Sequence, residues 1–341
     1  KISWGPGKTG NFLVSDHVQY HTMGRFTTYN DRIKYTFLTS FFPHPDEVYD
    51  ADQTGGADPV NTYTTSRNMI GLKMFMAYRV EGRLFNEKLG IALTEGIMYQ
   101  SDDGTLDVRA LNPFTIYHNY YIDTMANSLM TFEVNYTPIP SINIYGQLAL
   151  DEYALPSETS PTQRPNALGY MLGATYVQAM DEGVLEGNIE GVYTDPYLYL
   201  RGISETENND KEKTLNFVVA HRRWADHKII FDQTFLGYPY GGDAIVANIS
   251  LGYKRFGAWS VKGNAFYMVH GEKNVKSAWE TGKLGPSPSV SATHYVDIGV
   301  SGRYYLLEKV EVYGGLNFLG RITSSTDYHD VQLHMGLSYS L

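Results

Sequence analysis

The chain has 341 residues, a formal net charge of −10, no cysteine and 28 tyrosines. The acidic balance argues against nucleic acid as a partner, because phosphates are bound by basic surfaces. The lack of cysteine excludes disulfides, thiolate metal sites and cysteine nucleophiles. No apolar run approaches the length of about 18 residues that indicates a transmembrane helix.

Short motifs near the N-terminus suggest chemistry but are incomplete. Gly5-Pro6-Gly7-Lys8-Thr9 looks like the tail of a phosphate-binding loop, but the earlier glycine of such a loop is replaced by Ile2. Ser15-Asp16-His17 has the residue types of a catalytic triad, yet neighbours on a strand point to opposite faces. The acidic segment 50–61 lacks the carboxylate that closes a calcium loop, and no histidine pair has metal-ligand spacing. We therefore predict no enzymatic activity, no cofactor and no metal.

Alternation of apolar and polar residues predicts β-strands through most of the chain. At the C-terminus, the odd-numbered residues from Val331 to Leu341 are apolar and the even-numbered ones are polar or small. Successive strand side chains point to opposite faces, so one face of this strand is apolar. The same alternation occurs in segments 130–136, 142–151, 245–254, 261–270, 296–306 and 310–318.

Strand length and connection length favour a membrane barrel over a soluble sandwich. The predicted strands run about 10 to 15 residues, against about 5 to 6 in ordinary sheets, and about 9 to 11 tilted residues cross a bilayer. Short connections such as 30–32 and 256–257 alternate with long ones, namely 43–65, 101–126, 152–164, 203–212 and 271–291. We predict one all-β domain over residues 1–341: a transmembrane antiparallel up-and-down β-barrel of about 16 strands (about 14 to 18), with long extracellular loops and short periplasmic turns.

The strand count depends on the N-terminal residues. About 15 strands are clear, and closure with an even number requires one more, which we assign to residues 8–15. One further hairpin within 101–126 would bring the total to about 18. No signal peptide is visible at Lys1, so we expect an N-terminal region to precede it.

Aromatic residues cluster in the connections that we expect at the outer rim. Tyr238 and Tyr240 stand beside Gly241-Gly242-Asp243, and Trp279 lies in a later connection. Aromatic rings stack on the C–H faces of sugars while carboxylates bind hydroxyls, so this composition suits carbohydrate recognition. An aromatic girdle at the membrane interface is the alternative for any single ring.

An ordered set of short motifs runs across most of the chain. They are Trp4-Gly5-Pro6-Gly7 with 11–15, 78–80 with 93–95, 111–114 with 127–129, 145–151, and 236–243. On these motifs the sequence resembles the Wzi family of capsule-assembly outer-membrane proteins. The signature positions are Trp4, Gly5, Pro6, Gly7, Glu95, Asn127 and Asp151.

The resemblance implies an outer-membrane barrel that binds or anchors surface polysaccharide and has no enzymatic activity. Family members carry a helical region near the N-terminus, whereas this chain opens almost on the tryptophan motif. The candidate polysaccharide-binding residues are Asn112, Pro113, Tyr238, Tyr240, Asp243 and Trp279. The expected partners are outer-membrane lipid, surface polysaccharide and other envelope proteins.

Glu95 departs from the barrel pattern. It shares the parity of Leu89, Ile91 and Leu93, which would point its carboxylate at lipid. We expect a β-bulge to turn it inward; alternatively, the apolar face of this strand is the inner one.

Two other functions remain open on the residues alone. The polar strand faces, with Lys254, Lys262, Arg303 and Glu311 among them, suit the lumen of a porin or a substrate-selective channel. They equally suit a plugged lumen in which opposite charges pair. A structural barrel within an envelope protein complex is the other alternative.

Overall fold

The computed structural model describes residues 2–19, 21–43, 71–101, 103–117, 126–153, 165–201, 215–225, 227–277, 285–307 and 310–339. Within these ranges the regular structure consists of fifteen β-strands and one 3-10 helix, η1 (Val108–Leu111). Within the same ranges, no helix is long and apolar enough to cross a membrane. The strands are β1 (Thr22–Tyr29), β2 (Ile33–Phe42), β3 (Leu72–Leu84), β4 (Leu89–Ser101), β5 (Ala126–Ile139), β6 (Ile142–Glu152), β7 (Ala167–Met180), β8 (Gly183–Thr194), β9 (Val218–Ala225), β10 (Lys228–Phe235), β11 (Ala244–Arg255), β12 (Trp259–His270), β13 (Thr293–Leu307), β14 (Val310–Ile322) and β15 (Asp327–Tyr339).

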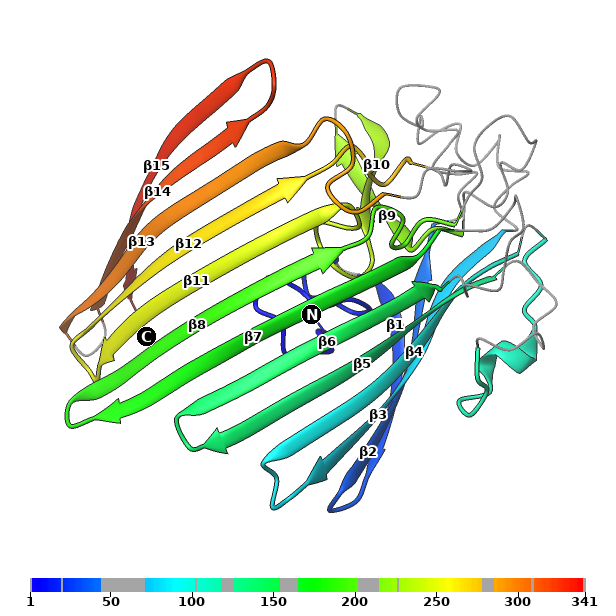
Figure 1. Ribbon diagram of the computed structural model, residues 1–341, viewed down its shortest axis with the longest axis horizontal. Helices are drawn as coiled ribbons and strands as arrows, with labels where there is room; N and C mark the ends of the chain where they lie inside the picture. The colour runs from blue at the N-terminus through cyan, green and yellow to red at the C-terminus, as the bar shows by residue number, and fades with distance from the viewer. Residues whose placement is uncertain are drawn as a thin grey trace.

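Thirteen of these strands form one antiparallel sheet in which almost every strand pairs with the next in sequence (Figure 1). The exception is β8, which pairs directly with β11, while β9 and β10 form a separate two-stranded hairpin. The strands β1 and β15 end the strand order. The predicted all-β, antiparallel, up-and-down architecture is confirmed.

The outer face of the sheet is apolar, as the alternation predicts. On β15, Leu333, Met335 and Leu337 are 70%, 76% and 66% exposed. Leu172 on β7 and Leu251 on β11 are exposed on the same face. Exposed apolar side chains that recur every second residue are typical of a surface that faces lipid.

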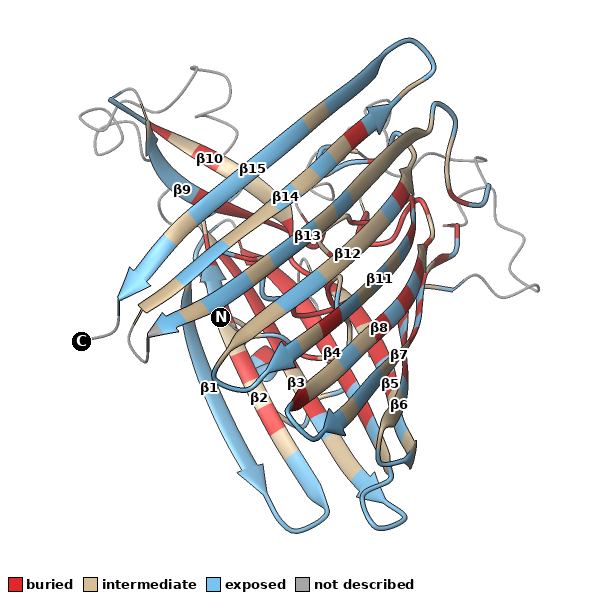
Figure 2. Cartoon of the chain, turned by 90° about the vertical axis from the view of Figure 1, so that its left-hand side faces the viewer, coloured by how far each residue is buried: buried red, intermediate tan, exposed pale blue. Residues whose placement is uncertain are grey.

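The inner face is packed on one side only. Figure 2 shows buried residues gathered on β2 to β8, whereas β1 and β15 are mostly exposed and β13 and β14 are mainly intermediate or exposed. The main hydrophobic core joins the inner faces of β2 to β8 to residues 4–18, 197–200 and 235–238. The N-terminal segment, defined here as residues 2–19, therefore fills the lumen beside β2 to β8.

The prediction that residues 8–15 form a sixteenth strand is wrong. These residues pair with no strand, and the segment holds only an isolated bridge between Trp4 and Val14. Phe12, Leu13 and Val14 are all buried in succession. A run that is buried on every side cannot face lipid on one side and the lumen on the other. Between β4 and β5, where a further hairpin would have raised the strand count, the described residues form η1 and no strand.

Candidate functional site

The N-terminal segment is attached to the barrel wall through Glu190 on β8. The Glu190 carboxylate accepts hydrogen bonds from the backbone N–H groups of Lys8 and Thr9, at 2.7 and 2.8 Å. It also accepts the Thr9 hydroxyl at 2.5 Å and the Tyr145 hydroxyl at 2.7 Å. The motif that looks like a phosphate loop thus does bind an anion through its backbone, but that anion is the protein's own carboxylate.

The glycines of the tryptophan motif allow this turn to close. Gly7 N–H donates to Asn11 Oδ1 at 2.9 Å, which folds the chain back on itself. A Cβ atom on Gly7 would lie 1.9 Å from the carbonyl oxygen of Gly10. Gly5 has a φ of +137°, and a Cβ there would lie 2.1 Å from Asn11 Oδ1. The signature residues Gly5 and Gly7 are therefore required by close contacts within the segment.

A chain of polar contacts connects the segment to the wall on the side of β3 to β6. Phe12 N–H donates to Gln147 Oε1 at 2.8 Å, and Gln147 Nε2 donates to Glu133 Oε1 at 2.8 Å. Arg79 donates to both oxygens of Glu133, at 2.5 and 2.7 Å. Because Gln147, Glu133 and Arg79 are all buried, this network is a fixed part of the lumen wall.

Tyr238, a predicted polysaccharide-binding residue, supports the N-terminal segment. Its hydroxyl lies 3.0 Å from Thr9 Oγ1, and its N–H donates to the Tyr199 hydroxyl at 2.9 Å. The Tyr199 hydroxyl donates to the Phe12 carbonyl at 2.6 Å, and the Asp151 carboxylate accepts the Tyr199 N–H at 2.7 Å. Burial raises the pKa of both tyrosines, so both remain neutral donors. Tyr238 is fully buried and contacts the N-terminal segment, so its side chain is not available at the surface.

Asp243 organises the connection between β12 and β13. It is fully buried and accepts hydrogen bonds from the N–H groups of Ser289 and Lys273, at 2.7 and 3.1 Å. The Ser289 hydroxyl is another donor to it. A Cβ atom on Gly271 would lie 2.1 Å from this carboxylate. Asp243 therefore holds Lys273 and Ser289 in place at the two described ends of this connection.

Tyr240 lies at the border between the packed and the unfilled side of the lumen. Its ring is 5.4 Å from that of Tyr238 and 5.3 Å from that of Phe266 on β12. Asp297 on β13 is directly opposite Phe266, and Tyr295 points to the same inner face. We call Tyr240, Phe266, Tyr295 and Asp297 the rim cluster; all four are partly exposed.

Asn112 and Pro113 lie on the other side of the sheet. The Pro113 carbonyl accepts the hydroxyl of Tyr35, and the Tyr35 ring stacks on Phe114 at 5.7 Å. Tyr35 is on the outer face of β2, since it pairs with Val80. Asn112 is exposed and ends η1. The structure therefore does not bring Asn112 and Pro113 together with Tyr238, Tyr240 and Asp243, and Trp279 lies outside the described residues.

Glu95 is on the outer face but is covered by the connection between β4 and β5. Its carboxylate accepts the Tyr78 hydroxyl and the Tyr117 N–H, the latter at 3.1 Å, and it is 1% exposed. The pairing of β4 with both neighbours runs without a register shift, so the expected bulge is wrong. The alternative is wrong as well, because Ile91 and Leu93 are 36% and 40% exposed on the outer face. Sequence parity placed the carboxylate on the correct face but could not reveal that Tyr117 lies over it.

The signature residues Asn127 and Asp151 flank a small cavity of about 10 Å3 between β5, β6 and residues 197–201. Arg201 donates to Asn127 Oδ1 at 3.1 Å. A cavity of this size holds about one water molecule. Asn127 and Asp151 therefore act in packing the lumen rather than in enclosing a ligand.

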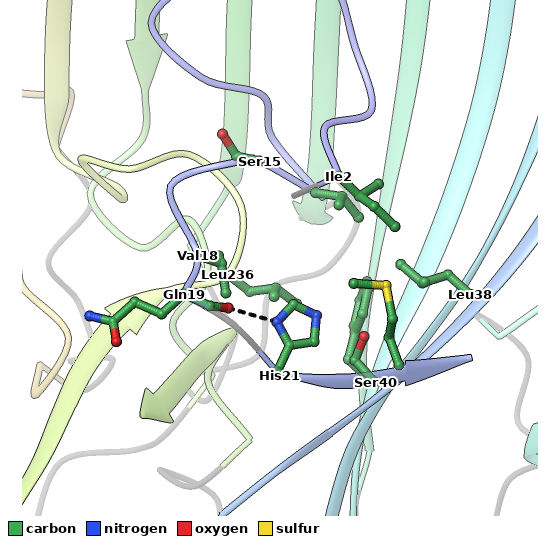
Figure 3. A pocket seen from close by; sticks show the side chains of 11 residues that line it. Ile2, Ser15, Val18, Gln19, His21, Leu38, Ser40 and Leu236 are labelled. Atoms are coloured by element: carbon green, nitrogen blue, oxygen red, sulfur yellow. Dashed lines mark hydrogen bonds between the residues drawn. The ribbon is translucent and has the colours of Figure 1, made fainter. Parts of the chain in front are cut away.

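A second cavity lies where the N-terminal segment meets β1 to β3 (Figure 3). It is lined mainly by apolar side chains, among them Ile2, Val18, Leu38 and Leu236, with His21 hydrogen-bonded to the Gln19 carbonyl at 2.9 Å. Its volume is about 60 Å3. Ligand pockets usually enclose about 300 to 1,000 Å3, so this space is a packing gap beside the N-terminal segment.

In the described ranges, no group of three or more His, Asp or Glu residues could hold a metal ion. The residues that sequence reasoning missed are Glu190, Arg79, Glu133 and Gln147. Arg79 and Gln147 lie within the motifs 78–80 and 145–151, and all four residues had the signal of a charged or amide side chain on the inner parity of a strand. That signal indicates a face but not a partner.

No family model and no curated protein matches the sequence. Among solved structures, the chain is similar to Wzi, an outer-membrane protein involved in group 1 capsule assembly in Escherichia coli and a carbohydrate-binding β-barrel, with a TM-score of 0.56 and 14% identity over 99% of this chain. The match spans 66% of Wzi, slightly under two thirds of its length. The chain is more distantly similar to the CymD monoaromatic hydrocarbon channel, with a TM-score of 0.31 and 9% identity over 94% of this chain and 82% of CymD. The resemblance to Wzi that the motifs indicated is thus confirmed for the fold, which is that of an outer-membrane β-barrel.

Proposed function

We propose that this protein is an integral barrel of the bacterial outer membrane that binds or anchors surface polysaccharide and catalyses no reaction. The observation that carries the proposal is the rim cluster, a group of partly exposed aromatic rings beside a carboxylate at the long-connection end of the lumen. Sugar rings stack on aromatic faces, and a carboxylate accepts sugar hydroxyls. The likeness of the fold to a carbohydrate-binding barrel supports the same function.

The packing beneath the cluster supports this interpretation. Tyr240 is held by Tyr238, and His270 Nε2 lies 3.0 Å from the Tyr240 carbonyl oxygen. Tyr238 is in turn bound to Thr9 of the N-terminal segment. The segment therefore serves as the base on which the rim cluster is built. A rigid aromatic surface binds a sugar at a lower entropic cost than a mobile one.

The test is glycan binding by the purified protein in detergent, measured by glycan array and by pull-down with capsular or exopolysaccharide. Tyr240→Ala should weaken binding by about tenfold, which corresponds to about 1.4 kcal/mol. Tyr304→Ala is the matched control, because Tyr304 is exposed on the outer face of β13. Absence of carbohydrate binding by the unaltered protein, or equal losses in both variants, would refute the proposal.

A channel is the second candidate, because polar inner side chains of β11 to β15 are not covered by the N-terminal segment. Lys254, Lys262 and Arg303 are exposed on that face. Single-channel recording in planar bilayers separates the two functions. Steady large openings would favour a channel, and silence would favour an occluded barrel. Outer-membrane lipid is a required partner in both cases, and co-purification after mild extraction would reveal any envelope protein partners.

A further inference from the structure

A hollow lies on the inner wall of β8 and β11 to β15, near the short turns and away from the rim cluster. It has a volume of about 340 Å3. Glu186 pairs with Gly252, Gly252 with Lys262, and Lys262 with Ser301, so these positions form one row across four strands on the inner face. The short side chains of Gly252, Ser260 and Ser301 leave the wall open there.

Cations dominate the lining of this hollow. Lys254, Lys262 and Arg303 line it together with a single carboxylate, Glu186. Lys254 pairs with Ser260, and Ser260 pairs with Arg303, so Lys262 is the diagonal neighbour of both other cations. Diagonal neighbours on one face of a sheet lie about 7 to 8 Å apart. Three positive groups are therefore close enough to bind one anion together, in a chain whose net charge is −10.

The cations are only partly neutralised within the protein. Arg303 Nη1 lies 3.5 Å from Glu311 Oε1, with the Arg303 side chain 62% exposed. Neither Lys254 nor Lys262 has an ion pair or a side-chain hydrogen bond within the ranges that the structure describes. Like charges on adjacent strands repel each other. An anion bound between them would remove this repulsion.

The other side chains of the lining complete a set of donors. Tyr313 and His334 lie flat against the wall because their cross-strand neighbours are glycines. A Cβ on Gly336 would be 2.4 Å from Tyr313 Cζ, and one on Gly315 would be 2.5 Å from His334 Cε1. Tyr313 thus brings a hydroxyl to the edge of the hollow, beside the hydroxyls of Ser260 and Ser301. Ammonium, guanidinium and hydroxyl donors around one space are the groups that bind an oxyanion.

We propose that this hollow is a binding site for an oxyanion group, either a carboxylate of an acidic sugar or a phosphate. The site goes beyond the proposed polysaccharide function, because it uses a different part of the wall and none of the rim-cluster residues. It would hold the charged group by Lys254, Lys262 and Arg303. Hydrogen bonds from charged donors are roughly twice as strong as those between neutral groups.

The experiment is isothermal titration of the purified chain in detergent with inorganic phosphate and with galacturonate, using galactose as the neutral comparison. The anions should bind and galactose should not. Lys254→Gln combined with Lys262→Gln should weaken anion binding by at least about tenfold. Lys88→Gln is the matched control, since Lys88 is exposed in the turn between β3 and β4.

A variant that should bind anions more tightly separates loss of the site from misfolding, because a misfolded protein would not gain affinity. Glu186→Gln removes the one negative side chain of the lining and should tighten anion binding by several fold. Binding of galacturonate alone would identify a sugar carboxylate as the ligand, and binding of phosphate alone would identify a phosphate group; both support the site. The proposal is overturned if neither anion binds, or if Lys88→Gln reduces binding as much as the double variant does. Rim-cluster variants test the polysaccharide function separately, since Tyr240→Ala should leave phosphate binding unchanged.

Discussion

Arg79 on β3 and Glu133 on β5 form two hydrogen bonds of 2.5 and 2.7 Å across the inner face of β4, the strand between them. Arg79 Nη1, which donates the shorter of these two bonds, also donates to the Thr94 hydroxyl oxygen on β4 at 3.1 Å. Both charged side chains are buried. The pair therefore ties three strands together at the place where the N-terminal segment is seated.

Breaking this pair on one side should be costly. Glu133→Leu removes two hydrogen bonds from the buried Arg79 and leaves it Glu81 as its remaining carboxylate, whose Oε1 lies 3.3 Å from Arg79 Nε, so we expect a loss of about 3 kcal/mol in the free energy of unfolding, measured by urea titration in lipid vesicles. The double variant Arg79→Met/Glu133→Leu removes both charges and should lose much less. A double variant as unstable as Glu133→Leu would contradict a paired interaction.

Removing the carboxylate that binds the N-terminal segment should release the segment. Glu190→Ala leaves the N–H groups of Lys8 and Thr9 without their acceptor. We expect a loss of about 2 to 4 kcal/mol and cleavage of residues 2–19 by added protease. Glu186→Ala is the control, because Glu186 lies on the same face of the same strand without contacting the segment. Equal protection of the segment in both variants would disprove its attachment through Glu190.

Because Glu95 is covered on the outer face, we can predict whether replacing it stabilises or destabilises the barrel. If Glu95 faced bare lipid, Glu95→Leu would stabilise the barrel; since it accepts the Tyr117 N–H and the Tyr78 hydroxyl, the change should destabilise it by about 1 to 3 kcal/mol. Leu93→Glu, on the same face and 40% exposed, should cost up to about 2 kcal/mol, less than a lysine or arginine at the bilayer midplane would cost. Unfolding titrations of both variants in vesicles measure these values. A more stable Glu95→Leu variant would contradict the covered arrangement.

Asp195, which follows β8, should make stability depend on pH. Burial raises the pKa of its carboxyl above the ordinary value. Hydrogen bonds from the Leu168 N–H and the Tyr193 hydroxyl favour the ionised form and lower the pKa, but burial has the larger effect. Between the ordinary pKa and this raised value the folded chain binds more protons than the unfolded chain, so the free energy of unfolding falls as pH rises. Asp195→Asn should remove this part of the slope, which begins at the ordinary carboxyl pKa of about 4 and extends upward. Identical pH profiles for the two proteins would exclude the effect.

A steric prediction concerns the tryptophan motif. Gly7→Ala places a Cβ atom 1.9 Å from the Gly10 carbonyl oxygen, a backbone atom that cannot move aside without opening the turn. We expect a lower midpoint of thermal unfolding and weaker protection of residues 2–19 from protease. Gly285→Ala, where a Cβ would meet nothing within 4 Å, should change neither measurement.

The sequence by itself determined the strands and their outer face. Lipid contacts every second residue of a spanning strand, so Leu251, Leu333 and Met335 carry their orientation in their parity. The course of the N-terminal segment was beyond such reasoning, since Thr9 and its acceptor Glu190 are separated by 181 residues. The same holds for Glu95, Asp243 and Tyr238: parity or composition marks them as unusual, but burial and partners arise only when distant segments meet. Local periodicity indicates whether a side chain faces lipid or the lumen. Only the tertiary structure decides which other residues bury that side chain and form its hydrogen bonds, because those residues come from distant parts of the chain.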